Sequence, residues 1–203
     1  MDGYRQIPLT QYLSAMREDS TQSDNSLIPP FSCPLNPDIE DFLKHKAAEF
    51  DRQSISRTFL VFASYKDVPV LVGYYTLANK VIVIRQRNVS SRMWKRVQKF
   101  GSVSAENKTC CISAPLIGQL GKNFENGYNT LITGSELLQM AIDQIRITQN
   151  ILGGKIIYLE CEDDPHLIEF YNKNQFYEFD RRRKDKDEEN LLGDTLVQML
   201  CYL

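Results

Sequence analysis

Cysteine and histidine, which often bind metals or supply a nucleophile and its base, are few in this sequence. The cysteines stand at positions 33, 110, 111, 161 and 201, and the histidines are His45 and His166. A zinc site would need long-range convergence, because no C-x-x-C pair or similar local spacing is present. Cys-His or Ser-His catalysis stays open, although no G-x-S-x-G sequence marks a nucleophile. Five unpatterned cysteines argue against a disulfide framework and favour a reducing compartment.

A basic stretch is the clearest candidate for binding an anion. Residues 85–99 carry six basic side chains and no acidic one, with Trp94 among them. Lysine and arginine contact nucleic-acid phosphates, and a tryptophan can stack on a base. The alternative is an ordinary solvated helix face. A second basic run, residues 181–184, precedes the mostly acidic residues 185–189 and is more typical of a charged hairpin.

The composition sets the class of protein. The chain has 203 residues, 42% hydrophobic and 25% charged, as expected of one globular domain. Its net charge of −2 argues against a general nucleic-acid or membrane-coating protein but permits a local basic patch. No apolar run approaches the ~18 residues of a membrane-spanning helix, and the start lacks a basic-then-apolar signal pattern. We therefore expect a soluble, cytoplasmic protein with no membrane partner.

The elements that must position these residues follow from periodicity and punctuation. Residues 1–30 are polar and indicate a loosely held arm with a short helix near 11–17, ahead of a single domain over residues 31–203. Helices are predicted from Asn36-Pro37, from Ser135 to the Gly153-Gly154 pair, and from Asp164-Pro165. Apolar runs predict strands at residues 58–64, 70–78, 81–84, 111–120, 155–161, 176–179 and 195–203. Residues 100–111 are expected to form a loop.

This order predicts an α+β or mixed α/β fold, because a βαβ unit is attached to an antiparallel meander and helices cover both faces of the sheet. Gly73, inside its strand, indicates a bulge or a close approach of backbone.

Three stretches of the chain resemble the GNAT superfamily of acetyl-CoA-dependent N-acetyltransferases. They are FSCPLNPDIEDFL through SRTFLVF and GYYTLA, LIGQLGKN followed by LITGSELL, and IIYLECEDDPHLIEFYNKNQF. The resemblance covers residues 31–203 and is greatest to the toxin-like branch, which acetylates the amino group of aminoacyl-tRNA. It implies a twisted, mostly antiparallel central sheet, a cytoplasmic enzyme, acetyl-CoA as cosubstrate and no metal.

The resemblance also implies where acetyl-CoA would bind. The backbone of Gln119 and Leu120 would pair with the pantetheine, and one N–H there would stabilise the oxyanion. The pyrophosphate would lie on the loop Asn129, Thr130, Leu131, Ile132, Thr133, Gly134 and Ser135. The family's usual loop has arginine or glutamine in place of Asn129 and glycine in place of Ile132. Only Gly134 matches it. Backbone N–H groups leading into a helix can still bind phosphate; the simpler alternative is an ordinary helix cap.

Tyr171 is the implied catalytic residue, because a tyrosine at this place in the family protonates the departing CoA thiolate. Its spacing from Leu167 and Ile168 equally fits a core position. Glu160 and Glu162 point the same way on their strand, but solvated carboxylates explain them as well, and no general base is assigned. Asp164 and Gln175 stand where the family usually has asparagine and glycine.

The toxin-like branch implies aminoacyl-tRNA as acceptor, bound through Arg92, Lys95 and Arg96, and a cognate antitoxin. Two alternatives stay open: an acetyltransferase of a small-molecule or protein amine, and a non-catalytic GNAT-fold module that binds or regulates a partner. An exposed strand edge near the C-terminus would support a homodimer.

Overall fold

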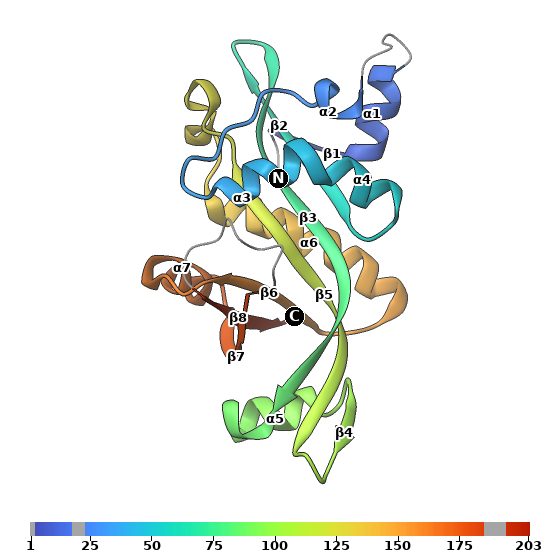
Figure 1. The fold of residues 1–203 in the computed structure, drawn as a ribbon, viewed down its shortest axis with the longest axis vertical. Coiled ribbons are helices and arrows are strands. Elements are labelled where there is room, and N and C mark those ends of the chain that lie inside the picture. The colour runs from blue at the N-terminus through green and yellow to red at the C-terminus, as the bar shows by residue number, and fades with distance from the viewer. Residues whose placement is uncertain (1–2, 18–22, 185–193) are drawn as a thin grey trace. The chain divides into compact units, whose positions relative to one another are not determined.

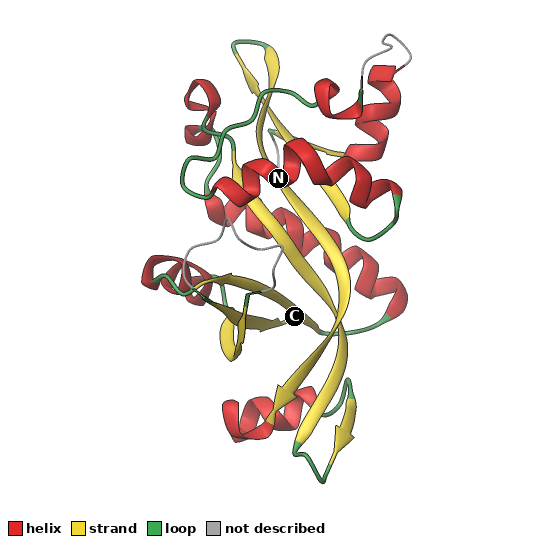
Figure 2. Ribbon diagram, in the orientation of Figure 1, coloured by secondary structure: helices red, strands yellow, loops and turns green. Residues whose placement is uncertain are grey.

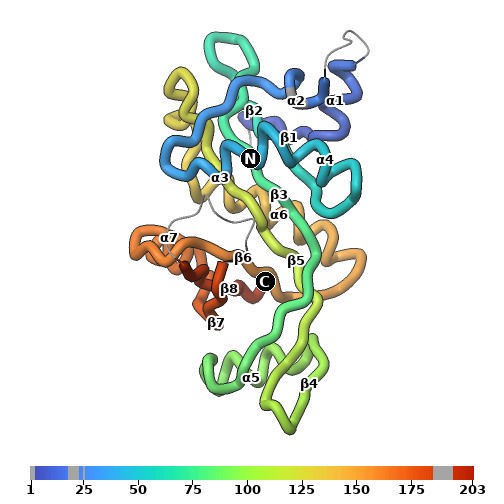
Figure 3. Tube along the Cα trace, viewed as in Figure 1, coloured from blue at the N-terminus to red at the C-terminus, as the bar shows by residue number. Residues whose placement is uncertain are grey.

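The computed structural model describes residues 3–17, 23–184 and 194–203. The chain divides into two compact units, each built from two segments. Unit 1 contains Met1–Ala78 and Gly118–Ile142, and unit 2 contains Asn79–Ile117 and Asp143–Leu203. Strands β3 (Val68–Arg85) and β5 (Thr109–Lys122) each contribute residues to both units, as the trace in Figure 3 lets the reader follow. These units do not coincide with the expected arm over residues 1–30 and domain over residues 31–203.

Over the described residues, eight strands pair in the order β1-β2-β3-β5-β6-β8-β7, with the short β4 on β5. The pairs β1–β2, β2–β3, β4–β5, β6–β8 and β7–β8 are antiparallel. Strands β5 and β6 are parallel. Helical segments and strands are interspersed along the chain (Figure 2). The predicted mixed α/β class with a mostly antiparallel sheet is therefore confirmed.

Unit 1 begins with an element that the sequence did not reveal. Residues Tyr4–Pro8 form strand β1, whose register along β2 places Tyr4 opposite Ala63. Helix α1 (Leu9–Arg17) follows directly and buries Leu9 completely. The expectation of a loosely held arm therefore differs from the structure over these residues, because edge pairing requires no strongly apolar sequence.

The elements that follow include the predicted helix after Asn36 and the predicted strand near residues 58–64, together with α2 (Asp24–Leu27), which was not predicted. They are α2, α3 (Pro37–Asp41), a π-helical turn (Phe42–Lys46), α4 (Ala47–Arg52) and β2 (Arg57–Tyr65). The predicted cap is present, since Asn36 Oδ1 accepts hydrogen bonds from the N–H groups of Asp38 at 3.0 Å and Ile39 at 3.4 Å. An apolar cluster that includes Leu9, Phe31 and Tyr74 fills the interior.

Strand β3 is one continuous strand of 18 residues, where the sequence predicted two. The residues between the two predicted strands, Asn79 and Lys80, stay extended because neither glycine nor proline interrupts them. The irregularity predicted at Gly73 is present as a register shift opposite Val61 and Phe62. A Cβ at Gly73 would lie 2.8 Å from the carbonyl oxygen of Gly121, so the close approach excludes a side chain.

Unit 2 contains the second half of β3 and the elements that follow it. They are a 3-10 turn (Gln86–Asn88), α5 (Ser91–Val97), β4 (Ser102–Ser104), β6 (Ile156–Glu162), α7 (Pro165–Lys173), β7 (Tyr177–Arg183) and β8 (Thr195–Tyr202). The expected loop over residues 100–111 contains β4, which pairs with the beginning of β5. The acidic residues 185–189 lie outside the described residues.

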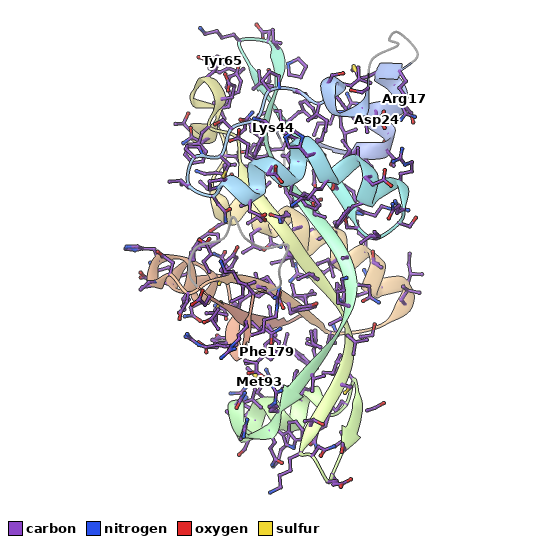
Figure 4. The ribbon with its side chains drawn as sticks, viewed as in Figure 1. Arg17, Asp24, Lys44, Tyr65, Met93 and Phe179 are labelled. Carbon is purple, nitrogen blue, oxygen red and sulfur yellow. The ribbon has the colours of Figure 1, made fainter. Side chains whose placement is uncertain are left out.

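A second apolar cluster forms the core of unit 2. It joins Trp94 of α5 to Ile84, Cys110 and Phe179, with Met93 packed against it. Figure 4 labels Met93 and Phe179, from α5 and β7 respectively. Helix α5 is therefore anchored to the strands of its own unit by buried side chains.

Two further helices hold the residues that the resemblance singled out. Helix α6 (Gly134–Leu152) ends at Gly153 and Gly154, which have φ values of 80° and 105°. Helix α7 is capped by Asp164, whose Oδ1 accepts from the His166 N–H at 2.7 Å and the Leu167 N–H at 3.1 Å. No helix among the described residues is long and apolar enough to cross a bilayer.

Candidate active site

The start of α6 carries a reciprocal cap. The Thr133 N–H and hydroxyl donate to Glu136 Oε2 at 2.8 and 2.7 Å, and Thr133 Oγ1 accepts from the Glu136 N–H at 3.1 Å. These bonds lower the pKa of the Glu136 carboxyl. The interpretation of Thr133 as a helix cap is therefore correct, and a negative charge lies at the positive end of the helix.

The cap does not use every donor at this terminus. The bond from the Leu137 N–H to the Thr133 carbonyl, 3.1 Å long, starts the helical pattern. The N–H groups of Gly134 and Ser135 precede that bond and have no helical acceptor. Ser135 is exposed, whereas the Ile132 side chain is buried with 3% of its surface accessible. Of the predicted loop residues, Gly134 and Ser135 therefore offer the clearest donors to a phosphate, and Ile132 contributes packing.

The loop before α6 is held in place by three hydrogen bonds. Its 3-10 turn (Glu125–Thr130) has left-handed φ values at Asn126 and Gly127. The Thr130 hydroxyl donates to the Gly127 carbonyl at 2.8 Å, the Lys122 ammonium to the Asn129 carbonyl at 3.1 Å, and the Tyr4 hydroxyl to the Leu131 carbonyl at 2.8 Å. Lys122 and Tyr4 were not predicted as site residues, since nothing local in the sequence connects them to this loop.

A buried asparagine ties the same loop to two other segments. Asn123 is fully buried; its Oδ1 accepts from the N–H groups of Ser32 and Glu125, each at 3.0 Å. Its Nδ2 donates to the carbonyls of Pro30 and Leu71, each at 2.9 Å. All the hydrogen-bonding capacity of this amide is thus used to fix where β5 ends and the loop begins.

Strand β5 supplies the residues predicted to pair with pantetheine. Its parallel pairing with β6 covers two residue pairs, Leu116 with Tyr158 and Ile117 with Leu159. Gln119 and Leu120 follow that pairing on β5. The Gln119 side chain is turned to the Asp38 carboxylate, with 3.1 Å between Nε2 and Oδ2, so any role of Gln119 toward a ligand would be through its backbone.

Tyr171 lies on α7 in unit 2 with its ring between two aromatic neighbours. The ring centroids of Phe170 and Phe176 are 5.0 and 6.1 Å away, both in edge-on arrangements. Burial, with a smaller contribution from Cys161, raises the pKa of the Tyr171 phenol. No described residue hydrogen-bonds to its hydroxyl. A phenol in this state keeps its proton at neutral pH, and its raised pKa makes it a weaker acid than an exposed phenol.

Glu160 is held by an ion pair and a hydrogen bond. Its carboxylate accepts two bonds from the Arg182 guanidinium, at 2.8 and 2.6 Å, and one from Gln198 Nε2 at 2.7 Å. The interpretation of Glu160 as a solvated carboxylate was wrong in detail, because its charge is paired with Arg182 of another strand. Arg181 likewise pairs with Asp163 and Glu178. Arg181 and Arg182 of the second basic run are therefore paired with acids elsewhere in the chain. The acidic residues that the hairpin interpretation gave as partners, 185–189, lie outside the described residues.

The three predicted tRNA-binding residues lie on α5, but they differ in availability. Arg92 and Lys95 are exposed. The Arg96 guanidinium lies over the ring of Tyr202, 5.0 Å from its centroid. Trp94 is only 8% exposed and belongs to the core, so the prediction that it stacks on a base was wrong. The helical period of α5 turns Trp94 inward, a direction that a stretch rich in basic residues concealed.

Gln175 stands where the family resemblance leads us to expect a glycine. It has a φ of 68° in the turn between α7 and β7. That left-handed conformation is the one glycine adopts without cost, which accounts for the glycine usual in the family. Among the described residues, no group of three or more histidine, cysteine, aspartate or glutamate side chains could hold a metal ion.

No family model and no curated protein matches this sequence. Solved structures do match. A bacterial toxin is 18% identical with a TM-score of 0.61, covering 98% of this chain and 90% of its own. The toxin AtaT complexed with acetyl-methionyl-tRNAfMet is 16% identical with a TM-score of 0.60, covering 96% and 93%. A Tyr-to-Phe mutant of AtaT, bound to acetyl-CoA and the C-terminus of the antitoxin AtaR, is 14% identical with a TM-score of 0.57, covering 99% and 94%. This chain therefore has the GNAT-like fold of these toxins over nearly its whole length.

Proposed function

We propose that this protein is an N-acetyltransferase that moves the acetyl group of acetyl-CoA to the amino group of an aminoacyl-tRNA. The observation that carries the proposal is the match, over nearly the whole of both chains, to a toxin whose structures hold acetyl-CoA and an acetylated methionyl-tRNA. The donors at the start of α6, the short β5–β6 pairing and the protonated Tyr171 are each consistent with that chemistry.

The roles of the residues follow from their chemistry. The N–H groups of Gly134 and Ser135 would bind pyrophosphate oxygens, and the backbone of Gln119 and Leu120 would hold the pantetheine amides. Residues 129–133 shape the loop. The Lys122 ammonium, fixed on the Asn129 carbonyl, would supply a positive charge that the usual loop takes from an arginine.

Transfer needs one bond made and one broken. The acceptor nitrogen attacks the thioester carbonyl, the C–S bond breaks, and the nitrogen loses a proton to solvent. Tyr171 would give its proton to the departing thiolate, since a phenol, with an ordinary pKa of about 10, is protonated at neutral pH. Arg92 and Lys95 would contact phosphates of the acceptor.

Two further features belong to the same proposal. A toxin of this kind would work in the cytoplasm, where aminoacyl-tRNA is found, and would be held by an antitoxin, as AtaT is by AtaR. Strand β7 ends the strand order and pairs only with β8 among the described strands. It supplies the strand edge near the C-terminus that a homodimer would use.

A non-catalytic module with the same fold is the second candidate. The observation that favours it is the Glu136 carboxylate at the start of α6, since a like charge there opposes a diphosphate.

Thermal unfolding with and without acetyl-CoA separates the two candidates. A ligand at about 100 times its dissociation constant adds roughly 2.7 kcal/mol of stability, which for a chain of this size raises the midpoint by roughly 5–11 °C. We expect such a shift, followed by transfer of labelled acetyl to aminoacyl-tRNA. No shift at millimolar acetyl-CoA would leave the non-catalytic module as the better description.

A further inference from the structure

Positive charge is concentrated in one segment of unit 2. Residues 79–109 contain eight basic side chains and one acidic side chain, a net charge of +7, whereas the whole chain carries −2. The rest of the chain is therefore strongly acidic. This segment comprises the second half of β3, α5, β4 and the approach to β5, which Figure 1 shows grouped at the far ends of the two long strands.

The segment contains a hollow of about 790 Å³, here called the basic pocket. Four basic residues line it: Arg85, Arg87, Lys95 and Lys108. Uncharged polar residues, among them Gln86 and Asn107, lie between them, and the described lining includes no carboxylate.

The four cations are not equivalent. Arg85 forms an ion pair with Asp180 of β7, which also accepts from Asn88 Nδ2 at 2.9 Å. Arg85 is thereby neutralised. Arg87, Lys95 and Lys108 are exposed, and none of them forms an ion pair with an acidic residue in the described parts of the chain. Three uncompensated charges thus face one concave surface.

The floor of the basic pocket is rigid. Trp94 is buried beneath it in the core of unit 2. The Gln86 N–H donates to the Lys108 carbonyl at 2.9 Å, which joins the two sides of the rim. Phe100, just after α5, packs on Tyr202 of β8 with 5.8 Å between ring centroids. The cations therefore project from a preorganised surface, which reduces the entropy lost on binding.

Given the proposed function, on which this inference rests, we propose that the basic pocket binds consecutive phosphates of the acceptor RNA backbone through Arg87, Lys95 and Lys108. These residues come from three separate segments and are exposed, an arrangement that suits a chain of phosphates better than one enclosed anion. The amides of Gln86 and Asn107 both donate and accept hydrogen bonds, as ribose hydroxyls require. The assignment takes Arg87 and Lys108, which line the basic pocket, in place of Arg96, which does not.

The test compares two triple variants of the full chain with equal loss of charge. One is Arg87→Gln, Lys95→Gln, Lys108→Gln; the matched control is Arg146→Gln, Lys155→Gln, Lys173→Gln, three exposed residues of the same unit. Binding of deacylated, fluorescently labelled tRNA is measured by anisotropy from 50 to 300 mM KCl. The pocket variant should bind at least about 10-fold more weakly at 100 mM. The negative slope of log K against log salt should become shallower by about 2 to 3. The control should change less than about 3-fold.

The outcomes separate this inference from the proposed function, because deacylated tRNA requires no acetyl transfer. Loss of binding in the pocket variant supports the inference even if no aminoacyl-tRNA is ever acetylated. Wild-type affinity and an unchanged salt slope in the pocket variant overturn it, even if acetyl transfer is observed. A polyglutamate peptide that binds as tightly as tRNA and is equally weakened in the pocket variant would also overturn it, since the site would then select charge alone.

Discussion

On the proposed function, single residues at the start of α6 would determine how well a diphosphate binds there. The N–H groups of Gly134 and Ser135 attract an anion, Lys122 adds a positive charge on the preceding loop, and the Glu136 carboxylate opposes both. A sequence motif reports which side chains are present but not the sum of these charges. The balance between them is therefore open to measurement by changing one charge at a time.

Replacing Glu136 with glutamine should strengthen acetyl-CoA binding. Glutamine keeps a capping oxygen for Thr133 but removes the charge, so the repulsion on a nearby diphosphate disappears. We expect the dissociation constant to fall about 3- to 10-fold at low salt, an energy of about 1 kcal/mol, and the gain to shrink at high salt. Isothermal titration at 50 and 500 mM KCl measures both. The control is Glu106→Gln, in the other unit; a weaker affinity for Glu136→Gln would show that the carboxylate aids binding.

Replacing Tyr171 with phenylalanine should slow transfer without changing cofactor affinity. Removal of the phenol leaves the packing against Phe170 and Phe176 intact and removes the proton donor. We expect kcat to fall about 100-fold or more, with the acetyl-CoA dissociation constant unchanged. An unaltered kcat would contradict the role of general acid, and a lower melting temperature with normal kcat would assign Tyr171 to the core.

Helices and strands that nearby residues determine could be predicted from the sequence. Those that depend on residues far along the chain could not. The caps at Asn36 and Asp164 could be predicted because their hydrogen bonds reach two or three residues along the chain. Strand β1 could not, since it pairs with β2, more than fifty residues later, and no local signal marks that pairing. The same reason hid Lys122 and Tyr4 from the candidate site. Trp94 was misassigned because its burial depends on β3 and β5 as well as on α5.

Asn123, where β5 meets the following loop, makes hydrogen bonds to distant residues that a mutation can test. Changing Asn123 to alanine leaves two N–H groups and two carbonyls without their buried partner. Each unsatisfied group costs about 1–3 kcal/mol, so we expect the free energy of unfolding to fall by at least about 3 kcal/mol in urea titrations. The exposed Asn107→Ala is the control. A loss below 1 kcal/mol would show that water replaces the amide.

At the scale of the whole molecule, buried acids that stay neutral link stability to alkaline pH. Burial raises the pKa values of the Tyr74, Tyr158 and Tyr171 phenols, and that of the Cys161 thiol to about 12. Because the folded state holds these protons longer than the unfolded state, their contribution is complete below the unfolded pKa values. Those values are about 8.5 for thiols and about 10 for phenols.

Stability should therefore stay nearly constant from pH 7 to about pH 8 as far as these groups are concerned, and then fall, more steeply above about pH 10. Each buried phenol contributes a slope of about 1.4 kcal/mol per pH unit in that upper range. Tyr158→Phe, which preserves the ring, should remove one such increment, whereas Phe in place of the exposed Tyr177 should not. Urea unfolding between pH 7 and 11 measures the slopes, and equal slopes for both variants would refute the linkage.

The division of each unit into two segments has a consequence for synthesis. Unit 1 needs Gly118–Ile142 beside Met1–Ala78, and unit 2 needs residues up to Leu203. A ribosome adds about 5–20 residues per second, so the first 78 residues wait several seconds or more before their missing strand and helix are made. Unit 1 stays incomplete until Ile142 has been added, and unit 2 until its second segment has been made. We therefore expect each unit to fold only after its second segment has been made, because the apolar residues of the first segment lack their packing partners until then.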